Sequence, residues 1–285
     1  MDKLVSIFDG LDSKDHARLT AFDTSIDIVN LDTGECIFKG LKNKVIIPGS
    51  GFIARKLFNI TGDEVTPSYN ESCGKYNINM YTPTTDTVPS NESDAKATKD
   101  NQKVLLFCCG TDGCGTENSQ VYPVDYTKWI SPEDLVPFRI TSGSDLSSSL
   151  RKIYFGRSTI NISGKQYTAY YFKRFEKDPI LVQQYVDSTP ITSTVYDDAK
   201  NTNAESYVEI SLRITKEDMR DYFNLTTGIS EAKINSISLC SGYPVEDTDG
   251  NIYYKDIRPL TKFNIPNEPL IDTTKGIAII YHIYM

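Results

Sequence analysis

The sequence has little of what most catalytic sites are built from. Only two of its 285 residues are histidine and one is tryptophan. It contains no Gly-x-Ser-x-Gly nucleophile elbow and no recognisable sequence pattern of paired catalytic carboxylates. His16 lies in a polar N-terminal segment, whereas His282 alternates with Ile280 and Tyr284 as a residue of a sheet does. We therefore expect a protein that is not an enzyme and that binds no cofactor.

Positive charge and long hydrophobic runs are also scarce. Lys and Arg number 30 against 38 Asp and Glu, which gives a formal net charge of -8. Phosphate contacts require a concentrated positive surface, so direct binding to nucleic acid is not expected. The longest apolar runs, such as residues 276–285, are about half the roughly 20 residues of a membrane span. With no secretory signal visible near residue 1, we expect a soluble chain made in a cytoplasm, with reduced cysteines.

Strand-forming residues are abundant. The chain has 18 tyrosines, and Tyr, Thr, Val and Ile together favour strands over helices. Apolar and polar residues alternate along 205–214, and alternating segments flank the turns "DTG" near residue 33 and "SGK" near residue 164. The fold class predicted is mainly β, with antiparallel, sandwich-like sheets and a few short helices.

Three short helices are predicted from capping signals. One follows Ser50 and ends before Gly62, and a second begins at Ser131 and is stopped by Pro137. The third follows the strand at 205–214, where Thr215 and Asp218 resemble a capping box with Asp in place of Glu.

The chain divides at one break in composition. Residues 81–103 contain almost nothing that could enter a core, which predicts an exposed polar loop or insertion. Residues 1–80 then form a β-rich part with a short helix, and 104–285 form the main β-rich domain with a C-terminal strand. The alternative is a single domain that includes both parts.

The stretch "FCCGTDGCG" at 107–115 is the best case for chemistry. Cys108, Cys109 and Cys114 are weak candidates for metal ligands, because a structural zinc site usually takes its thiolates and imidazoles as two close pairs. The nearest further cysteine is Cys73, and the spacing is not that of a Cys-x-x-Cys redox centre. The favoured interpretation is a buried strand, "VLLFCC", that runs into a glycine-rich turn, with a reduced core cysteine at 108 or 109.

Other local patterns have simpler interpretations. "PGSGFIARK" lacks the spacing of a phosphate loop, and "DTDGN" at 247–251 fits a hairpin turn better than a calcium loop. Tyrosines among basic residues at 167–175 could stack on bases or glycans, but they more often cover sheet faces.

Three stretches resemble one family of proteins. Residues 41–60, "LKNKVIIPGSGFIARKLFNI", and 113–139, "GCGTENSQVYPVDYTKWISPEDLVPFR", look like segments of tailed-bacteriophage virion structural proteins. Residues 233–285, from "KINSISLC" to "GIAIIYHIYM", resemble the last module of many phage tail, baseplate and neck proteins. That module has a strand, a variable hairpin, a segment like "FNIPNEPL" and a terminal strand.

The resemblance implies a structural subunit without an active site. Its expected partners are other virion structural proteins and copies of itself, in a virion assembled in the host cytoplasm. Exposed strands and extended loops pair with neighbours in such assemblies. We therefore expect contacts at the insertion 81–103 and at the terminal strand, with Tyr281, Ile283, Tyr284 and Met285 as interface candidates. The alternatives are a carbohydrate- or receptor-binding β module of a tail fibre, and a hydrolase or metalloprotein whose site is not visible in the sequence.

Overall fold

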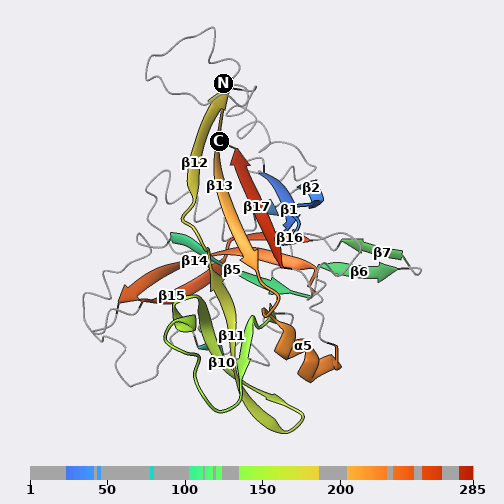
Figure 1. Cartoon of the computed structure of the whole chain (residues 1–285), viewed down its shortest axis with the longest axis vertical. Coiled ribbons are helices and arrows are strands. Elements are labelled where there is room, and N and C mark those ends of the chain that lie inside the picture. The colour runs from blue at the N-terminus through green and yellow to red at the C-terminus, as the bar shows by residue number, and fades with distance from the viewer. Residues whose placement is uncertain are drawn as a thin grey trace, which may run out of the picture.

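The computed structural model is mainly β, as predicted (Figure 1). The strand pairs in it are antiparallel and form two large sheets and one two-stranded ribbon. The ribbon joins β6 (Cys114–Glu117) to β7 (Gln120–Pro123). The structure describes residues 24–41, 44–45, 78–79, 103–111, 113–117, 120–123, 135–185, 204–229, 234–246, 252–264 and 276–284.

The smaller of the two large sheets has five strands in the order β12-β13-β17-β1-β2. Its strands are β1 (Thr24–Asn30), β2 (Cys36–Leu41), β12 (Ile180–Tyr185), β13 (Ala204–Ile214) and β17 (Ile277–Tyr284). The predicted hairpin around residue 33 joins β1 to β2, and the predicted strand at 205–214 is β13. Because β1 pairs with β17, segments from both sides of residues 81–103 share one sheet.

The larger sheet has ten strands, with the main order β3-β16-β14-β5-β11-β10-β4. Three further strands attach to it: β15 to β14, β8 to β5 and β9 to β11. The bounds of its ten strands are β3 (Lys44–Val45), β4 (Ile78–Asn79), β5 (Lys103–Gly110), β8 (Leu135–Val136), β9 (Arg139–Thr141), β10 (Tyr154–Ile162), β11 (Lys165–Arg174), β14 (Ser236–Glu246), β15 (Ile252–Pro259) and β16 (Thr261–Asn264).

The main core lies between the two large sheets. Alternation along β13 directs Ile210, Leu212 and Ile214 to one face, where each is at most 3% exposed. They belong to one buried cluster with Phe107 of β5 and Leu239 of β14, which come from the larger sheet. Each such side chain contributes about 1.5–3 kcal/mol when removed from water, so this cluster is what joins the sheets.

A second core lies on the other face of the larger sheet. Leu106 and Cys108 of β5 point to this face, while their neighbours Phe107 and Cys109 enter the main core. Phe155 of β10 and Tyr254 of β15 meet edge to face, with ring centroids 4.8 Å apart. Since β14, β5 and β11 lie between β10 and β15 in the sheet, this contact requires the sheet to curl.

The hairpin of β10 and β11 confirms the turn predicted at "SGK". Ser163 and Gly164 both have positive φ angles, 52° and 80°, as the two central residues of a type I′ turn require. Gly156 within β10 also has a positive φ, 68°, and an added Cβ would lie 2.2 Å from Cδ2 of Phe172. Only glycine fits this close approach between neighbouring strands.

The helix predictions have mixed outcomes. The helix expected after β13 is α5 (Arg220–Thr227), which ends at Gly228 in the left-handed conformation. The prediction for 131–137 is wrong at Leu135 and Val136, because these residues extend the sheet as β8 beside β5. A short 3-10 turn at Leu150–Lys152 was not anticipated. The helix predicted at 50–62 and the insertion up to residue 102 lie outside the described residues.

Candidate functional site

The first candidate site is the outer edge of β12, here called the β12 edge. β12 is the last strand of the five-stranded sheet and pairs with β13 from Ile180 to Tyr185 (Figure 1). Within the described ranges no strand pairs with its other side. Ile180 and Leu181 are 50% and 59% exposed, and the strand "ILVQQY" carries no charged side chain. An exposed, uncharged strand edge presents backbone N–H and C=O groups to which another strand can pair.

The opposite edge of the same sheet is built differently. β2 pairs with β1 through two register irregularities, and Gly40 adopts a φ of 67°. The N–H of Gly40 donates to the carboxylate of Asp27, 2.8 Å away, and Lys39 is exposed. Bulges, glycine and lysine are features that prevent pairing at an edge. One edge of this sheet is therefore blunted, and the β12 edge is not.

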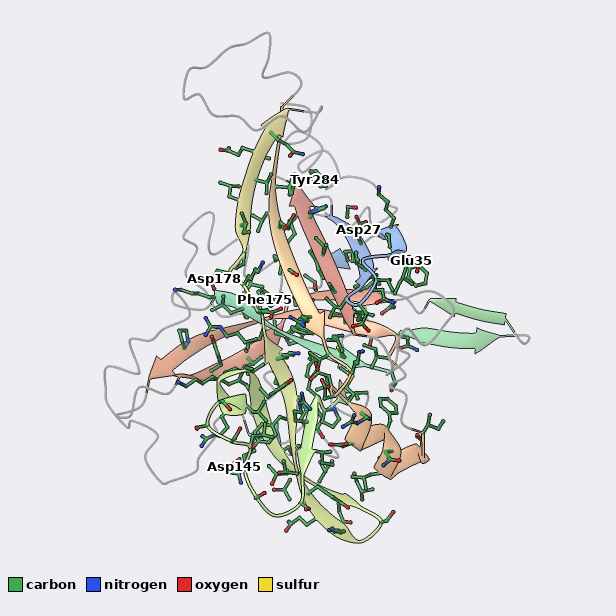
Figure 2. All side chains as sticks on the ribbon, in the orientation of Figure 1. Asp27, Glu35, Asp145, Phe175, Asp178 and Tyr284 are labelled. Carbon is green, nitrogen blue, oxygen red and sulfur yellow. The ribbon has the colours of Figure 1, made fainter. Side chains whose placement is uncertain are left out.

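The terminal strand does not provide the free edge expected of it. β17 lies in the interior of the sheet, paired with β1 on one side and with β13 on the other. Tyr281 is fully buried, so the prediction that it is an interface residue is wrong: its register directs it into the core. Tyr284 is partly exposed near the end of the strand (Figure 2), as is Ile283, and both stay predictions. Met285 lies outside the described residues.

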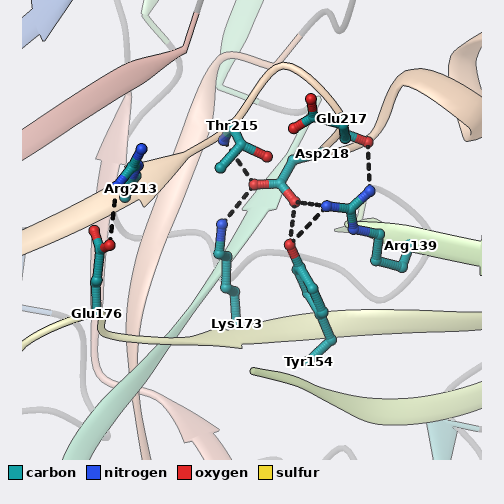
Figure 3. Close-up of polar contacts among 8 residues, drawn as sticks. All are labelled: Arg139, Tyr154, Lys173, Glu176, Arg213, Thr215, Glu217 and Asp218. Carbon is teal, nitrogen blue, oxygen red and sulfur yellow. Dashed lines mark hydrogen bonds and ion pairs between the residues drawn. The ribbon is translucent and has the colours of Figure 1, made fainter. Parts of the chain in front are cut away.

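A buried polar cluster, here called the Asp218 cluster, is the most concentrated set of charges in the described part of the chain (Figure 3). It consists of Asp218, Lys173, Arg139, Tyr154 and the N–H of Thr215. Asp218 is fully buried and its carboxylate accepts from Lys173 Nζ at 2.6 Å, from Tyr154 Oη at 2.7 Å and from Thr215 N at 2.8 Å. Arg139 Nη2 lies 3.5 Å from the same carboxylate.

The Asp218 cluster connects the two large sheets. Thr215 and Asp218 follow β13 of the smaller sheet, whereas Arg139 and Lys173 are on β9 and β11 of the larger one. The N–H of Met219 adds a backbone bond, 2.9 Å long, to the carbonyl of Phe138. The capping-box prediction is half confirmed: the Asp218 carboxylate does accept from the N–H of Thr215, but α5 begins only at Arg220.

The chemistry of this cluster suits it to holding strands in place. Burial, and then the nearby charge of Asp218, raise the pKa of Tyr154 well above its usual value, so the phenol stays a neutral donor. Arg139 also donates to the carbonyl of Glu217 at 3.1 Å and to Tyr154 Oη at 2.9 Å. Because the Asp218 carboxylate is fully buried and accepts from Lys173, Tyr154 and the N–H of Thr215, the geometry favours a structural link over a general base.

The cysteines of "FCCGTDGCG" do not converge. Cys108 and Cys109 are both fully buried, but they are adjacent in β5 and so face opposite cores. Cys108 Sγ lies 3.6 Å from Cys240 Sγ of β14, and burial raises the pKa of both Cys109 and Cys240. The two thiols of 108 and 109 therefore behave as core residues, as the favoured interpretation had it. The side chain of Cys114 lies outside the described residues.

Other residues singled out in the sequence are placed as follows. Tyr170 and Tyr171 are fully buried, which removes them as an exposed stacking surface for bases or glycans. His282 lies 3.3 Å from the carboxylate of Glu209 on the neighbouring strand, as a sheet residue. His16, Trp129, the glycines near residue 50 and the loop 247–251 lie outside the described residues, although β14 and β15 do flank that loop as a hairpin.

Comparisons with protein-family models, curated proteins and solved structures find no match for this chain. No three metal-ligating side chains of the described residues come together. Over the same residues, no helix combines the length and apolar character needed to cross a bilayer.

The sequence interpretation missed both candidate sites. Residues 180–185 were not recognised as a strand, although the apolar run "ILV" after Pro179 was a usable signal. Asp218 was noticed only as a capping residue. Its partners Lys173 and Arg139 lie 45 and 79 residues away along the chain, and no local pattern marks such a pairing.

Proposed function

We propose that this chain is a structural subunit of a bacteriophage virion, in the tail, the baseplate or the head-to-tail neck. It acts by protein-protein contacts with other virion proteins and with copies of itself, and it is assembled in the host cytoplasm. The observation that carries the proposal is the β12 edge, which exposes Ile180 and Leu181 and which pairs, among the described strands, with β13 alone, in a sheet whose other edge is blunted.

The contrast between the two edges supports assembly because edge strands are normally protected. A soluble protein that acts alone gains nothing from an uncharged strand edge with exposed apolar side chains, because such an edge promotes aggregation. β2 shows how this same sheet protects an edge, with Gly40, Lys39 and an irregular register. An edge left open in the same sheet is consistent with a place where a partner strand docks.

The residues that carry the family resemblance also support the proposal through their positions. The module 233–285 comprises β14, β15 and β16 of the larger sheet and β17 of the smaller one. Both β14 and β17 are interior strands that contribute to the main core, through Leu239 and Ile279 for example. A module of this kind specifies the sandwich itself, so the resemblance concerns the scaffold of the subunit.

The Asp218 cluster fits a rigid building block. It fixes the exit of β13 against β9, β10 and β11 by charged hydrogen bonds away from solvent. Breaking a buried pair of this kind by removing one partner typically costs about 3–5 kcal/mol, so the two sheets resist sliding past each other. A subunit that transmits force or holds a defined position in a particle benefits from such rigidity.

The decisive experiment is to look for the chain in the particle. Virions of the phage that encodes it are purified on a density gradient, and their proteins are quantified by mass spectrometry against the major capsid protein. We expect the chain in a fixed number of copies per particle, and gold-labelled antibody against it at the tail or neck. Absence of the chain from intact, infectious virions contradicts the proposal.

A further inference from the structure

Cys108 and Cys240 form a close pair of thiols in the second core. Their two Sγ atoms lie 3.6 Å apart, and both side chains are fully buried. They belong to β5 and β14, which are neighbouring interior strands of the ten-stranded sheet. A disulfide bond is about 2.05 Å long, so the two sulfurs have to approach each other by about 1.5 Å to form one.

The strand register places the two cysteines diagonally across the ladder between β5 and β14. Cys108 lies opposite Ser238 and Cys240 lies opposite Leu106, so both thiols are on the same face of the sheet. The register is irregular immediately after Cys240, between this residue and Ser241. Such an irregularity disrupts the ladder locally, so the backbone at Cys240 has room for the small shift that bond formation requires.

Cys109 provides a comparison within the same strand. It follows Cys108 directly and is equally buried, but its side chain enters the main core on the opposite face of the sheet. The geometry therefore gives Cys240 one partner, although two cysteines stand side by side in the sequence.

Burial protects this pair of thiols from reaction while the sheet is closed. It raises the pKa of Cys240 well above the usual value, because the charged thiolate is poorly stabilised away from water. The thiolate is the form that attacks a disulfide, so thiol–disulfide exchange is slow in the folded chain. A reducing cytoplasm also keeps thiols reduced. The pair therefore reacts when the sheet opens briefly in the presence of an oxidant.

We propose that Cys108 and Cys240 are a redox-sensitive latch, reduced in the host cytoplasm and joined by a disulfide once the chain meets a small-molecule disulfide outside the cell. This inference rests on the proposed structural role, because a released virion carries its subunits from the first environment to the second. The latch joins positions 132 residues apart in the chain. A cross-link that closes a long loop restrains the unfolded chain, so the released subunit becomes harder to unfold.

The bond forms by two successive exchange reactions, for which oxidised glutathione is a suitable oxidant. The thiolate of one cysteine attacks a sulfur of the oxidant, and one glutathione leaves. The second cysteine then attacks the mixed disulfide, which forms the bond between Cys108 and Cys240 and releases the other glutathione. Two electrons pass from the cysteines to glutathione, and the two thiol protons end on the released glutathione thiols.

Disulfide mapping of the full chain provides the first test. The chain is incubated at mildly alkaline pH with oxidised glutathione, in urea below the unfolding transition, and its remaining thiols are alkylated in full denaturant. We expect tryptic peptide 104–128 to be linked to 234–255, with fragmentation assigning the link to Cys108 and Cys240. A Cys240 that stays free, carries only glutathione or links to Cys109 overturns the inference.

Two matched variants test which thiol forms the link. Cys108→Ala and Cys109→Ala each remove one fully buried thiol from β5. We expect the link to Cys240 to be lost in the first variant and kept in the second, with circular dichroism confirming that each is folded. Equal linking in the two variants overturns the inference. If either variant fails to fold, the fragmentation of the parent chain decides alone.

The effect of the latch on unfolding is a separate readout. We expect the oxidised chain to unfold at a higher urea concentration than the reduced chain. In Cys108→Ala the two midpoints should coincide, because no link to Cys240 can form. An oxidised parent chain that unfolds at the same or a lower urea concentration contradicts a stabilising latch.

Mapping the chain from purified virions, without reductant, separates this inference from the proposed function. A chain that is present in virions with both thiols free overturns the inference and leaves the structural role intact. A chain that forms the link on oxidation but is absent from virions supports the chemistry of the pair and overturns the structural role.

Discussion

The Asp218 cluster and the β12 edge border the same strand, β13, and they are opposites in their polar contacts. At the end of β13, the carboxylate of Asp218 is fully buried and accepts bonds from three different partners. Along the side of β13, β12 leaves Leu181 59% exposed and is the end strand of the sheet as far as the described strands go. One region surrounds a buried carboxylate whose oxygens are bonded, while the other leaves apolar side chains in water.

From this difference we expect the Asp218 cluster to determine the stability of the fold and the β12 edge to determine its association with partners. Substitutions in the Asp218 cluster should lower the free energy of unfolding and leave association unchanged. Substitutions at the β12 edge should do the reverse. The following predictions test that separation on the free energy of unfolding, measured by chemical denaturation of the full chain at a concentration where it is monomeric.

The largest effect is expected at Asp218. Asp218→Asn keeps the shape of the side chain but removes its charge, which leaves Lys173 and Arg139 without their buried counter-ion. We expect the free energy of unfolding to fall by about 3–5 kcal/mol. The control is Glu176→Gln, which removes one partner of an exposed pair with Arg213 and should change stability by less than about 1 kcal/mol. Equal losses in the two variants would mean that the cluster does not anchor the region around it.

A smaller loss is expected at Gly156, which lies two residues beyond Tyr154 of the cluster. Gly156→Ala introduces a Cβ 2.2 Å from the ring of Phe172, at a φ that favours glycine. The expected cost is about 2–4 kcal/mol from backbone strain and overpacking together. Gly164→Ala serves as the control, because its φ of 80° is similar but no atom lies within 4 Å of the added Cβ. It should cost about 1 kcal/mol, from backbone strain alone.

The pH dependence of the free energy of unfolding tests how well the core around the Tyr170 phenol excludes water. Burial, and then a hydrogen bond to Asp145, raise the pKa of Tyr170 from 10.0 to about 12. The folded chain thus keeps Tyr170 protonated at pH values where the unfolded chain ionises it. The raised pKa of Tyr170 contributes on the order of 2 kcal/mol to the free energy of unfolding. This contribution is present in full below pH 10 and is lost as the pH rises to about 12.

The matched variant for this measurement is Tyr170→Phe. It has no phenol to ionise, so its stability should fall less steeply between pH 10 and 12 than that of the parent chain. Parallel slopes for the two proteins would show that Tyr170 ionises normally in the folded state.

The smallest effect on stability is expected at the β12 edge. Leu181→Lys removes little buried surface, because the leucine is already mostly in water. The free energy of unfolding should therefore change by less than about 0.5 kcal/mol. A large loss of stability at this position would end the proposed separation between the two regions.

Much of the fold could be predicted from local patterns. Alternation identified β13 and the hairpin of β10 and β11, and the apolar run before Gly110 identified β5. These predictions succeed because side-chain direction in a strand has a period of two, which the sequence displays directly. The prediction at Leu135 and Val136 failed because pairing with β5 overrode a helical capping signal.

The candidate sites were much less predictable. The sequence shows that β17 is a strand, but not that β1 and β13 pair along both its sides and bury Tyr281. It shows Cys108 and Cys109 side by side, and strand geometry then sends them into different cores. Short β12, with only six residues, was overlooked although it forms an edge of the sheet.

The sequence by itself determined the mainly β class, the strand periodicity and the turn chemistry, because each depends on residues a few positions apart. Only the tertiary structure decided the order of the strands, and with it which edge is open and which charges meet. Lys173, Arg139 and Asp218 are brought together from two sheets, and the strand order places β17 inside the five-stranded sheet and β12 at its end. Such choices depend on how the whole core packs, since strand pairing joins segments that are distant in the chain.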